Sequence, residues 1–240
     1  MPNSKCVVIF SGGLDSTVIL QYCIKQYSEV YCITYNYNQR HKIEIDRALD
    51  YTSDIGVGEG QIIKQHFVVD LGFYSELANS SALTNLDIEV PKMKDVVGEA
   101  QNTAHVPNRN SVMLNIAAGL AESINAREIF YGAAKVDNIS GHWDGTKEFL
   151  EKINDTLALN RQTQIRVKAP LMELEKFQII TWGLNLGVDF SKTYTCYNGK
   201  ELACGTCPAC SSRIQGFIDA KLIDPVKYSV QIPWSTFGIE

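Results

Sequence analysis

The 240-residue sequence lacks any apolar run long enough to cross a membrane. Such a span needs roughly 18 consecutive apolar residues. The first residues, Met1 to Lys5, lead directly into a short strand-like segment rather than into the apolar stretch of a signal peptide. The chain also has no internal repeat and no low-complexity tract. We therefore expect a cytoplasmic protein that has no membrane among its partners.

Positive charge is scarce as well. The 22 Lys and Arg residues are outnumbered by 27 Asp and Glu residues, which gives a formal net charge of -5. Without a general basic field, the chain needs a local patch to hold a tRNA-sized polyanion. Direct nucleic-acid binding is therefore disfavoured, and a small-molecule substrate is favoured. The 45% of hydrophobic residues is ordinary for a globular protein that folds on its own.

Short β-branched segments alternate with segments of helical periodicity along most of the chain. Strands are expected at 5–10, 30–37, 62–71, 128–134 and 164–169, and helices at 16–26, 42–55, 111–125, 148–159 and 174–186. This order predicts an α/β domain over 1–190, with a doubly wound parallel sheet that binds ligands at the carboxyl ends of its strands. Residues 72–103 should form a partly ordered insertion over the site. A small C-terminal segment, 191–240, should pack on the domain.

A glycine-rich loop lies where the first expected strand passes into the first helix. It reads Phe10-Ser11-Gly12-Gly13-Leu14-Asp15-Ser16-Thr17. Glycines let the backbone approach an anion, serine hydroxyls donate to phosphate oxygens, and a helix N-terminus adds partial positive charge. The loop lacks the lysine of a Walker loop, which argues against transfer of a terminal phosphoryl group. A plain tight turn with a helix cap is the alternative.

Seven cysteines fall into two groups. Cys6, Cys23 and Cys32 lie singly in apolar stretches and should be buried small hydrophobes. The other four crowd into fifteen residues: Cys196, Cys204, Cys207 and Cys210. Four thiolates at this spacing favour a closed structural zinc site. An iron–sulfur cluster and a metal-free group of thiols remain open.

The segment Ser11 to Ser16 resembles the SGGxDS loop of the ATP-pyrophosphatase family. Members of that family have an adenine-nucleotide-hydrolase-like fold and hold pyrophosphate in this loop while a nucleophile attacks the α-phosphorus of ATP. The resemblance implies an adenylated product, with Asp15 near the phosphates or their Mg²⁺. A helix cap is the other role open to Asp15.

Three further segments resemble 7-cyano-7-deazaguanine synthases of the queuosine pathway. They are Cys196-Tyr197 with Cys204-Gly205-x-Cys207-x2-Cys210-x2-Arg213 and Phe217, then Tyr37-x-Gln39-Arg40-His41-x2-Glu44, and Val106-Pro107-x-Arg109-Asn110. The resemblance implies an AMP-forming carbon–nitrogen ligase that uses ATP, Mg²⁺, a structural Zn²⁺, 7-carboxy-7-deazaguanine and ammonia. Pro2 stands where a glutaminase of the N-terminal-nucleophile type has cysteine, so ammonia should come from solution.

The same resemblance suggests which residues contact substrate or nucleotide: His41, Arg109, Asn110, Asp137, Ser140, Gly141 and Asp144. Each has a plainer alternative. His41 is equally suited to a helix start, and Arg109 to a surface ion pair. Ordinary loop turns would account for the segment 137–141.

One segment departs from the family pattern. Where typical members read approximately Ser-Gly-Tyr-Pro-Asp-Cys-Arg-Pro-Glu-Phe, this chain keeps Asp144, Glu148 and Phe149 but has Gly145 and Thr146 in place of Cys and Arg. Loss of an arginine near a substrate would weaken selectivity or change the end product to the amide, with Trp143 as a substitute stacking surface. Neutral drift in a surface loop is the alternative.

Four other functions remain open at this stage. They are a related adenylating enzyme that stops at the amide, one that uses a different acid, a tRNA-modifying enzyme with the same loop, and a non-enzymatic zinc module. The apolar tail from Ile232 to Phe237 suggests a homodimer interface.

Overall fold

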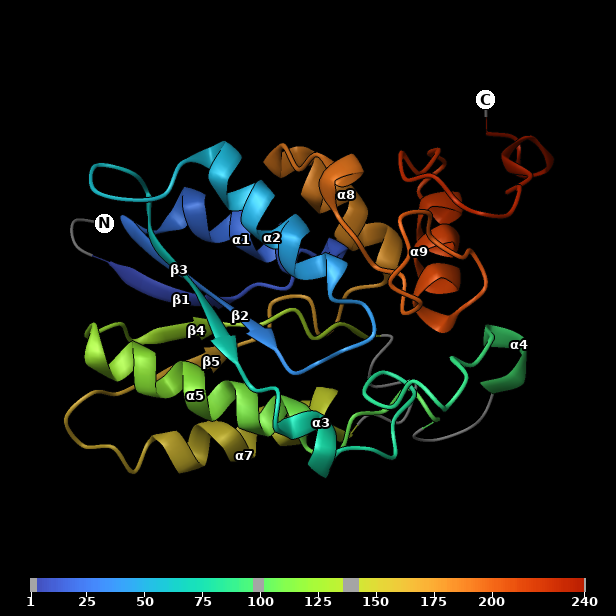
Figure 1. The fold of residues 1–240 in the computed structure, drawn as a ribbon. Coiled ribbons are helices and arrows are strands. Elements are labelled where there is room, and N and C mark those ends of the chain that lie inside the picture. Colours follow the sequence, from blue (N-terminus) through green and yellow to red (C-terminus); the bar gives the residue numbers. More distant parts are fainter. Residues whose placement is uncertain (1–3, 97–101, 136–142, 240) are drawn as a thin grey trace.

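Five parallel strands form one sheet in the computed structural model, which describes residues 4–96, 102–135 and 143–239. In sheet order they are β3 (Ile63–Asp70), β2 (Glu29–Asn36), β1 (Lys5–Ile9), β4 (Glu128–Phe130) and β5 (Arg166–Lys168). Strand order reverses beside β1, because β2 and β3 lie on one side of it and β4 and β5 on the other (Figure 1). The predicted α/β class and parallel sheet are confirmed.

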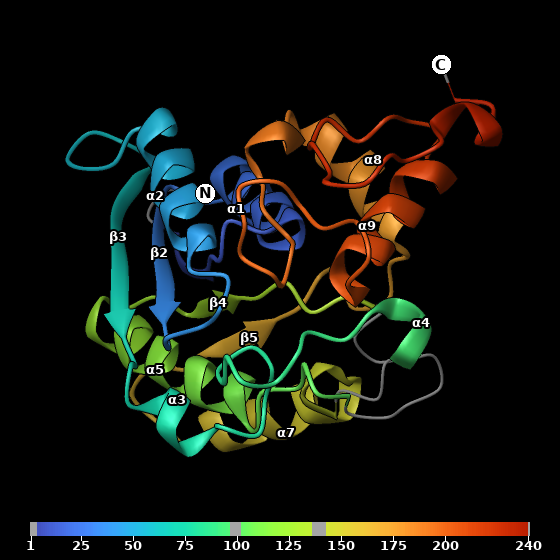
Figure 2. The same ribbon diagram turned by 45° about the vertical axis from the view of Figure 1, so that its right-hand side comes forward.

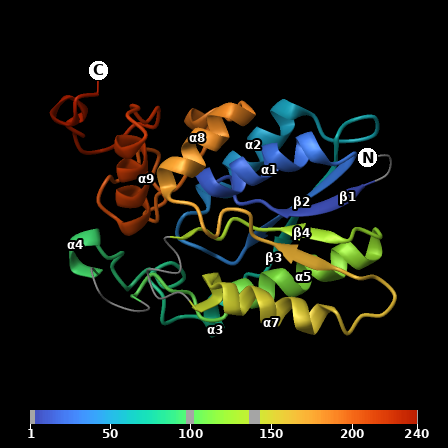
Figure 3. The same cartoon turned by 180° about the vertical axis from the view of Figure 1, so that it is seen from behind.

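Helices cover both faces of the sheet. On one face lie α1 (Leu14–Gln26), α2 (Ile43–Ile55) and α8 (Lys176–Leu186), and on the other lie α5 (Arg109–Ser123) and α7 (Lys147–Leu157) (Figures 1 and 3). Each face has its own buried apolar cluster, because side chains of a strand alternate between the two faces. Val7 and Ile33 pack toward α5, whereas Cys6, Val8 and Cys32 pack toward α1. None of the helices in the described ranges is both long and apolar enough to span a membrane.

Every predicted strand and helix is present, but β4 ends earlier than predicted. The strand was expected to reach residue 134, and it ends at Phe130. Beyond it the chain passes in front of the glycine loop: a Cβ on Gly132 would lie 3.2 Å from the Ser16 amide nitrogen and 3.3 Å from the Asp15 Cβ. The apolar residues after Phe130 therefore form a wall of the site and do not extend the sheet.

The insertion after β3 contains two short helices, α3 (Tyr74–Leu77) and α4 (Met93–Val96). A single arginine before α2 orders much of it, because Arg40 Nε donates to the Ala82 carbonyl (2.9 Å) and Arg40 Nη2 to the Ile88 carbonyl (2.7 Å). Figure 2 shows α4 beside α9 (Pro208–Asp219). The Met93 amide donates to the Thr206 carbonyl there (3.0 Å).

The chain ends in a segment with little regular structure apart from α9. Two short turns flank it, η2 (Phe190–Lys192) and η3 (Trp234–Phe237). Helix α9 packs on α8, where a Cβ on Gly216 would lie 2.3 Å from Lys176 Cγ. Trp234 packs against the α1-side core, and Phe237 is 43% exposed. The division of the chain into a domain over 1–190 and a small segment over 191–240 stays a prediction, and so does the homodimer.

Two helical glycines give a matched test of the packing between α8 and its neighbours. A Cβ on Gly183 in α8 would lie 2.5 Å from Phe190 Cζ and 2.8 Å from Val18 Cγ2, both of them buried side chains, whereas a Cβ on Gly119 in α5 would meet nothing within 4 Å. We expect Gly183→Ala to lower the free energy of unfolding by about 1–3 kcal/mol through overpacking. Gly119→Ala should raise it by about 0.5–1 kcal/mol. Urea unfolding of both variants measures these values, and equal effects would contradict the packing described.

Candidate functional site

A cavity lies at the carboxyl ends of the strands, where the order of the sheet reverses. It has a volume of about 330 Å³. Open α/β sheets bind ligands at this point of their topology. The residues that line the cavity and carry polar groups include Ser11, Asp15, Ser16, His41, Glu44, Arg109, Asn110, Asp144 and Lys176. The predicted glycine loop and four of the predicted substrate residues are therefore brought to one place.

The glycine loop forms the part of the cavity beside α1. Ser11 and Ser16 place their hydroxyl oxygens 3.1 Å apart, and the Ser11 amide donates to Ser16 Oγ (3.2 Å). The N-cap of α1 is Gly13, which has no side chain that could accept a hydrogen bond from the amides of the first turn. The helix thus presents its N-terminus to the cavity together with two hydroxyls, which is the environment that phosphate groups favour.

Not every residue of the predicted loop lines the cavity. Phe10 and Leu14 line it and are also buried in the core cluster, but Gly12 and Thr17 do not line it. Thr17 Oγ1 donates to the Gly13 carbonyl (2.8 Å), so its hydroxyl is used within the helix. These last two residues shape the loop and make no wall of the cavity.

Gly12 is the point of closest packing around the loop. Its φ is +76°, and a Cβ would lie 2.7 Å from the Glu44 carbonyl oxygen and 2.8 Å from the Ala48 amide nitrogen of α2. The Tyr194 amide also donates to the Gly12 carbonyl (3.0 Å). Only glycine satisfies both the left-handed backbone and the contact with α2. The loop is therefore fixed by segments from opposite ends of the chain.

Lys176 contacts the loop from α8, in the first turn of that helix. Its Nζ lies 2.7 Å from each carboxylate oxygen of Asp15, and both side chains are largely buried. The sequence interpretation missed this residue, because the pair is separated by 161 positions. The signal was present, since helices that follow parallel strands begin at the carboxyl edge of the sheet and Lys176 starts such a helix. The loop that lacks a lysine of its own receives one from α8.

Arg109 and Asn110 begin α5 on the opposite face. Arg109 Nη1 donates to the Tyr37 hydroxyl (3.3 Å), and the guanidinium lies 6.0 Å from the Tyr37 ring centroid. Burial lowers the pKa of Arg109, but the Tyr37 hydroxyl and the Asp144 carboxylate outweigh it and raise the pKa above its ordinary value. The guanidinium is a permanent positive charge in the cavity wall. It has no ion-pair partner among the described residues, so the predicted surface ion pair is not what the structure shows.

His41 lies just before α2 in a cluster of polar side chains. Its Nε2 is 3.3 Å from Glu44 Oε1, and Gln39 Nε2 donates to the same oxygen (3.1 Å). The Tyr197 ring centroid lies 5.9 Å from that of His41. His41 Nδ1 is buried and has no hydrogen-bond partner within the described ranges. The histidine thus contributes to the wall of the cavity and does not cap α2, whose N-cap is Lys42.

The segment that departs from the family pattern leads into α7. Asp137, Ser140 and Gly141 lie outside the described residues, whereas Asp144 is 4% exposed and lines the cavity. Thr146 is the N-cap of α7 and accepts a hydrogen bond from the Phe149 amide (3.1 Å). Trp143 packs edge-on against Phe149, with centroids 5.4 Å apart, and is not one of the described residues that line the cavity. The stacking role suggested for Trp143 has no support in this arrangement.

The four clustered cysteines bring their sulfur atoms within 4.8 Å of one another. Backbone amides point at them: the Cys204 amide donates to Cys196 Sγ (3.2 Å), and the Cys207 amide donates to Cys204 Sγ (3.3 Å). Amide hydrogen bonds to sulfur stabilise thiolates, the form that binds metals. This cluster can hold a metal ion. Cys6, Cys23 and Cys32 are fully buried in the α1-side core, as predicted.

Comparison with known proteins assigns the chain to a family. Residues 5–221 match the model of the queuosine biosynthesis protein QueC. The chain belongs to this family. It is 37% identical over 224 residues to the 7-cyano-7-deazaguanine synthase of Pseudoalteromonas atlantica, covering 93% of this chain and 98% of that protein. The 7-cyano-7-deazaguanine synthase of Clostridium kluyveri is 37% identical over 230 residues, covering 93% of this chain and 97% of the relative.

Among solved structures, the U34-tRNA thiolase NcsA from Methanococcus maripaludis with its [4Fe-4S] cluster aligns at a TM-score of 0.46 and 16% identity. The alignment covers 90% of this chain and 65% of that one. Similarity at this level does not bear on the substrate or the metal.

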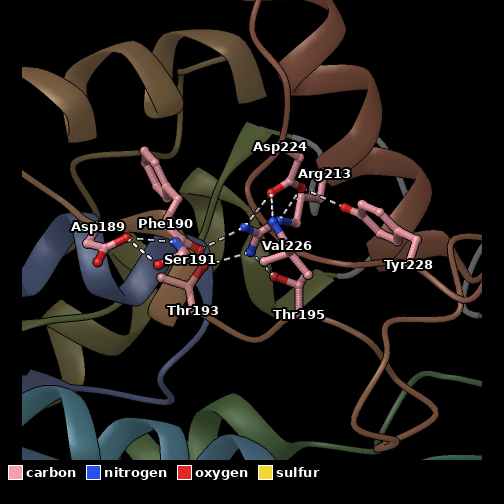
Figure 4. A network of polar contacts seen from close by, with 9 residues as sticks. All are labelled: Asp189, Phe190, Ser191, Thr193, Thr195, Arg213, Asp224, Val226 and Tyr228. Atoms are coloured by element: carbon pink, nitrogen blue, oxygen red, sulfur yellow. Dashed lines mark hydrogen bonds and ion pairs between the residues drawn. The ribbon is translucent and has the colours of Figure 1, made fainter. Parts of the chain in front are cut away.

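A buried arginine joins the cysteine segment of this QueC family member to the rest of the domain. Arg213 in α9 is 2% exposed and forms a forked ion pair with Asp224, with Nε–Oδ2 2.6 Å and Nη2–Oδ1 2.9 Å (Figure 4). Tyr228 also donates its hydroxyl to Asp224 Oδ2 (2.6 Å). Both carboxylate oxygens of Asp224 are therefore hydrogen-bonded, as a buried ion pair requires.

The same guanidinium holds the segment that precedes the first clustered cysteine. Arg213 Nη1 donates to Thr193 Oγ1 (2.7 Å) and Nη2 to the Phe190 carbonyl (3.0 Å). Tyr194, which follows Thr193, is the residue whose amide bonds the Gly12 carbonyl. Arg213 therefore connects α9, the Asp224 loop and the support of the glycine loop.

Arg213 is predicted to be a major stability determinant. Arg213→Met leaves the Asp224 carboxylate buried without its partner, so the free energy of unfolding should fall by about 3–5 kcal/mol. Arg213→Lys should recover only part of the loss, because an ammonium cannot form the fork. Asp54→Asn, which removes an exposed pair with Lys192, is the control and should change stability little. Urea unfolding compares the three, and a small effect of Arg213→Met would refute the role.

Proposed function

We propose that this chain is an ATP-dependent ligase that converts 7-carboxy-7-deazaguanine and ammonia into 7-cyano-7-deazaguanine, with release of AMP and pyrophosphate. The observation that carries the proposal is the lysine-free glycine loop at the N-terminus of α1, which opens on a cavity with the half-buried Arg109 on its other side. Two relatives that match over nearly their whole length are named for this reaction, which supports the assignment.

In this proposal the glycine loop holds the β- and γ-phosphates of ATP. Ser11 and Ser16 donate hydroxyl hydrogen bonds, the α1 N-terminus contributes partial positive charge, and Lys176 supplies a full charge beside the loop. Asp15 is the residue that would hold the Mg²⁺ that accompanies ATP. The positive charges of Lys176 and Mg²⁺ beside the loop would stabilise pyrophosphate as the leaving group.

The acid would bind on the α5 side, where the Arg109 guanidinium faces the cavity. A carboxylate oxygen attacks the α-phosphorus and pyrophosphate leaves. Ammonia then attacks the acyl carbon, and AMP leaves with the electron pair of the broken C–O bond. A second ATP adenylates the amide oxygen, and loss of AMP with two protons leaves the nitrile. The protein's contribution is positioning and charge stabilisation, since no side chain needs to form a covalent bond.

We also propose that Cys196, Cys204, Cys207 and Cys210 hold one structural Zn²⁺. Four sulfurs within 4.8 Å of one another satisfy tetrahedral coordination and leave no open position for a water. The metal would contribute folding energy to a segment with little regular structure. Its place beside Tyr197, Pro208 and Ala209, which line the cavity, would fix that wall.

The nucleotide product tests the adenylation chemistry. With 7-carboxy-7-deazaguanine, ATP, Mg²⁺ and ammonium, the chain should release AMP and pyrophosphate, resolved by ³¹P NMR, and mass spectrometry should show nitrile rather than only amide. Asp15→Ala removes the proposed Mg²⁺ ligand and Lys176→Met removes the positive charge beside the loop, so each should lower kcat by about 100-fold or more. Lys192→Met removes an exposed lysine away from the cavity and is the control. ADP as the only nucleotide product would eliminate the proposal.

Metal analysis tests the cysteine site. Elemental analysis should find one zinc per chain in wild type, and none in Cys207→Ser, whose stability should fall because metal binding is part of the folding free energy. Cys23→Ala alters a buried core cysteine and should keep the zinc. Iron with visible absorption in the freshly reduced protein would refute zinc.

A further inference from the structure

Three described acidic residues line the cavity, and two of them already have partners. Asp15 is paired with Lys176, and Glu44 Oε1 lies within hydrogen-bonding distance of Gln39 and His41. Asp144 is different. Although only 4% of the residue is exposed, its carboxylate makes neither a hydrogen bond nor an ion pair within the described ranges. Buried carboxylates are nearly always paired, so this one is left for a ligand.

The backbone around Asp144 is firmly held. Asn110 Nδ2 donates to the Asp144 carbonyl (3.4 Å), and Thr146 Oγ1 donates to the Trp143 carbonyl (2.8 Å). Packing of Trp143 on Phe149 fixes the turn from its outer side. These contacts hold residues 143–146 against α5 and α7, so the Asp144 carboxylate keeps one place. It is a pre-positioned acceptor in the cavity wall.

Its location separates Asp144 from the phosphate site. The glycine loop leads into α1 on one face of the sheet, whereas the turn of Asp144 contacts α5 and α7 on the other (Figure 1). Arg109 starts α5 beside Asn110, the residue that holds Asp144. A ligand in this part of the cavity thus meets one fixed positive and one fixed negative group.

We propose that Asp144 binds the edge of the substrate that carries two adjacent N–H donors, the ring N1–H and the exocyclic 2-amino group of a guanine-like heterocycle. This inference rests on the proposed function and assigns the recognition of its substrate. Two carboxylate oxygens accept two parallel hydrogen bonds from that edge, as they do from a guanidinium. An adenine edge offers an acceptor at N1 and is repelled. Arg109 holds the carboxylate at the other end of the same molecule.

A substrate analogue that lacks the 2-amino group tests the assignment without mutation. For wild type, kcat/KM should fall about 10- to 100-fold when 7-carboxy-7-deazahypoxanthine replaces 7-carboxy-7-deazaguanine, because one acceptor oxygen is left unpaired. For Asp144→Ala the two acids should react at nearly equal, low rates. A discrimination of the same size in wild type and Asp144→Ala would overturn the proposal.

Two further measurements exclude a structural or nucleotide-binding role. Asp144→Asn should change the stability of the ligand-free protein little, because the carboxylate makes no hydrogen bond or ion pair among the described residues and acts on the Arg109 charge only at longer range. Titration calorimetry should show unchanged ATP affinity, and Glu151→Gln, an exposed change on α7, should match wild type throughout. Lower stability of Asp144→Asn or weakened ATP binding would assign Asp144 to the fold or to the ribose and Mg²⁺ instead.

Failure of the proposed function is distinguished by binding alone. If wild type does not convert the acid, calorimetry with 7-deazaguanine and 7-deazahypoxanthine still compares the two edges. Preferential binding of 7-deazaguanine that Asp144→Ala abolishes would preserve this inference while the reaction is rejected. Equal binding of both compounds by wild type would overturn it.

Discussion

The site depends on the contact between Gly12 and the backbone of α2. The absence of a side chain lets the turn after β1 lie against the Glu44 carbonyl and the Ala48 amide. This contact sets how far α1 stands from α2, and hence where the first turn of α1 points. Tyr194 adds the third support through its bond to the Gly12 carbonyl. An anion site built from backbone dipoles works only if its donors are held in place, because freely moving dipoles would have to reorganise around the charge.

The cavity joins a region of positive charge with a region that carries one positive and one negative side chain. On the α1 side, hydroxyls, helix N-terminus and Lys176 suit an anion, and on the α5 side Arg109 and Asp144 can read both ends of a small polar molecule. Both sides meet where the sheet reverses its order, so a nucleotide and an acid would be brought together without any movement of domains. Holding the two substrates side by side would be the protein's main contribution, because the proposed reaction needs no covalent bond to a side chain.

The pattern of strands and helices was predictable because local periodicity and the glycine loop agree with the final topology. The clustered cysteines were predictable for the same reason, since their spacing is local. Lys176, Asp224 and Tyr228 were missed, because each acts through a partner far away or in a segment without periodicity. Arg40 shows a third kind of failure: its motif was noticed, but its role in ordering the insertion depends on carbonyl groups, which any residue type supplies. Thr146, which stands where the family pattern has arginine, caps α7, and the effect of that change on selectivity stays a prediction.

The Arg213 network also has a consequence for how the protein is made. The cavity wall draws on residues from Ile9 to Ser212, and the brace that supports it is complete only with Tyr228. During synthesis the sheet can form once β5 has been made. The Arg213 network that supports the cavity wall, however, is complete only some sixty residues later, from 168 to 228. At ribosomal elongation rates of about 5–20 residues per second, that interval lasts several seconds. A nascent chain of this kind exposes apolar residues of the cavity wall during that interval, and transiently exposed apolar surface favours aggregation.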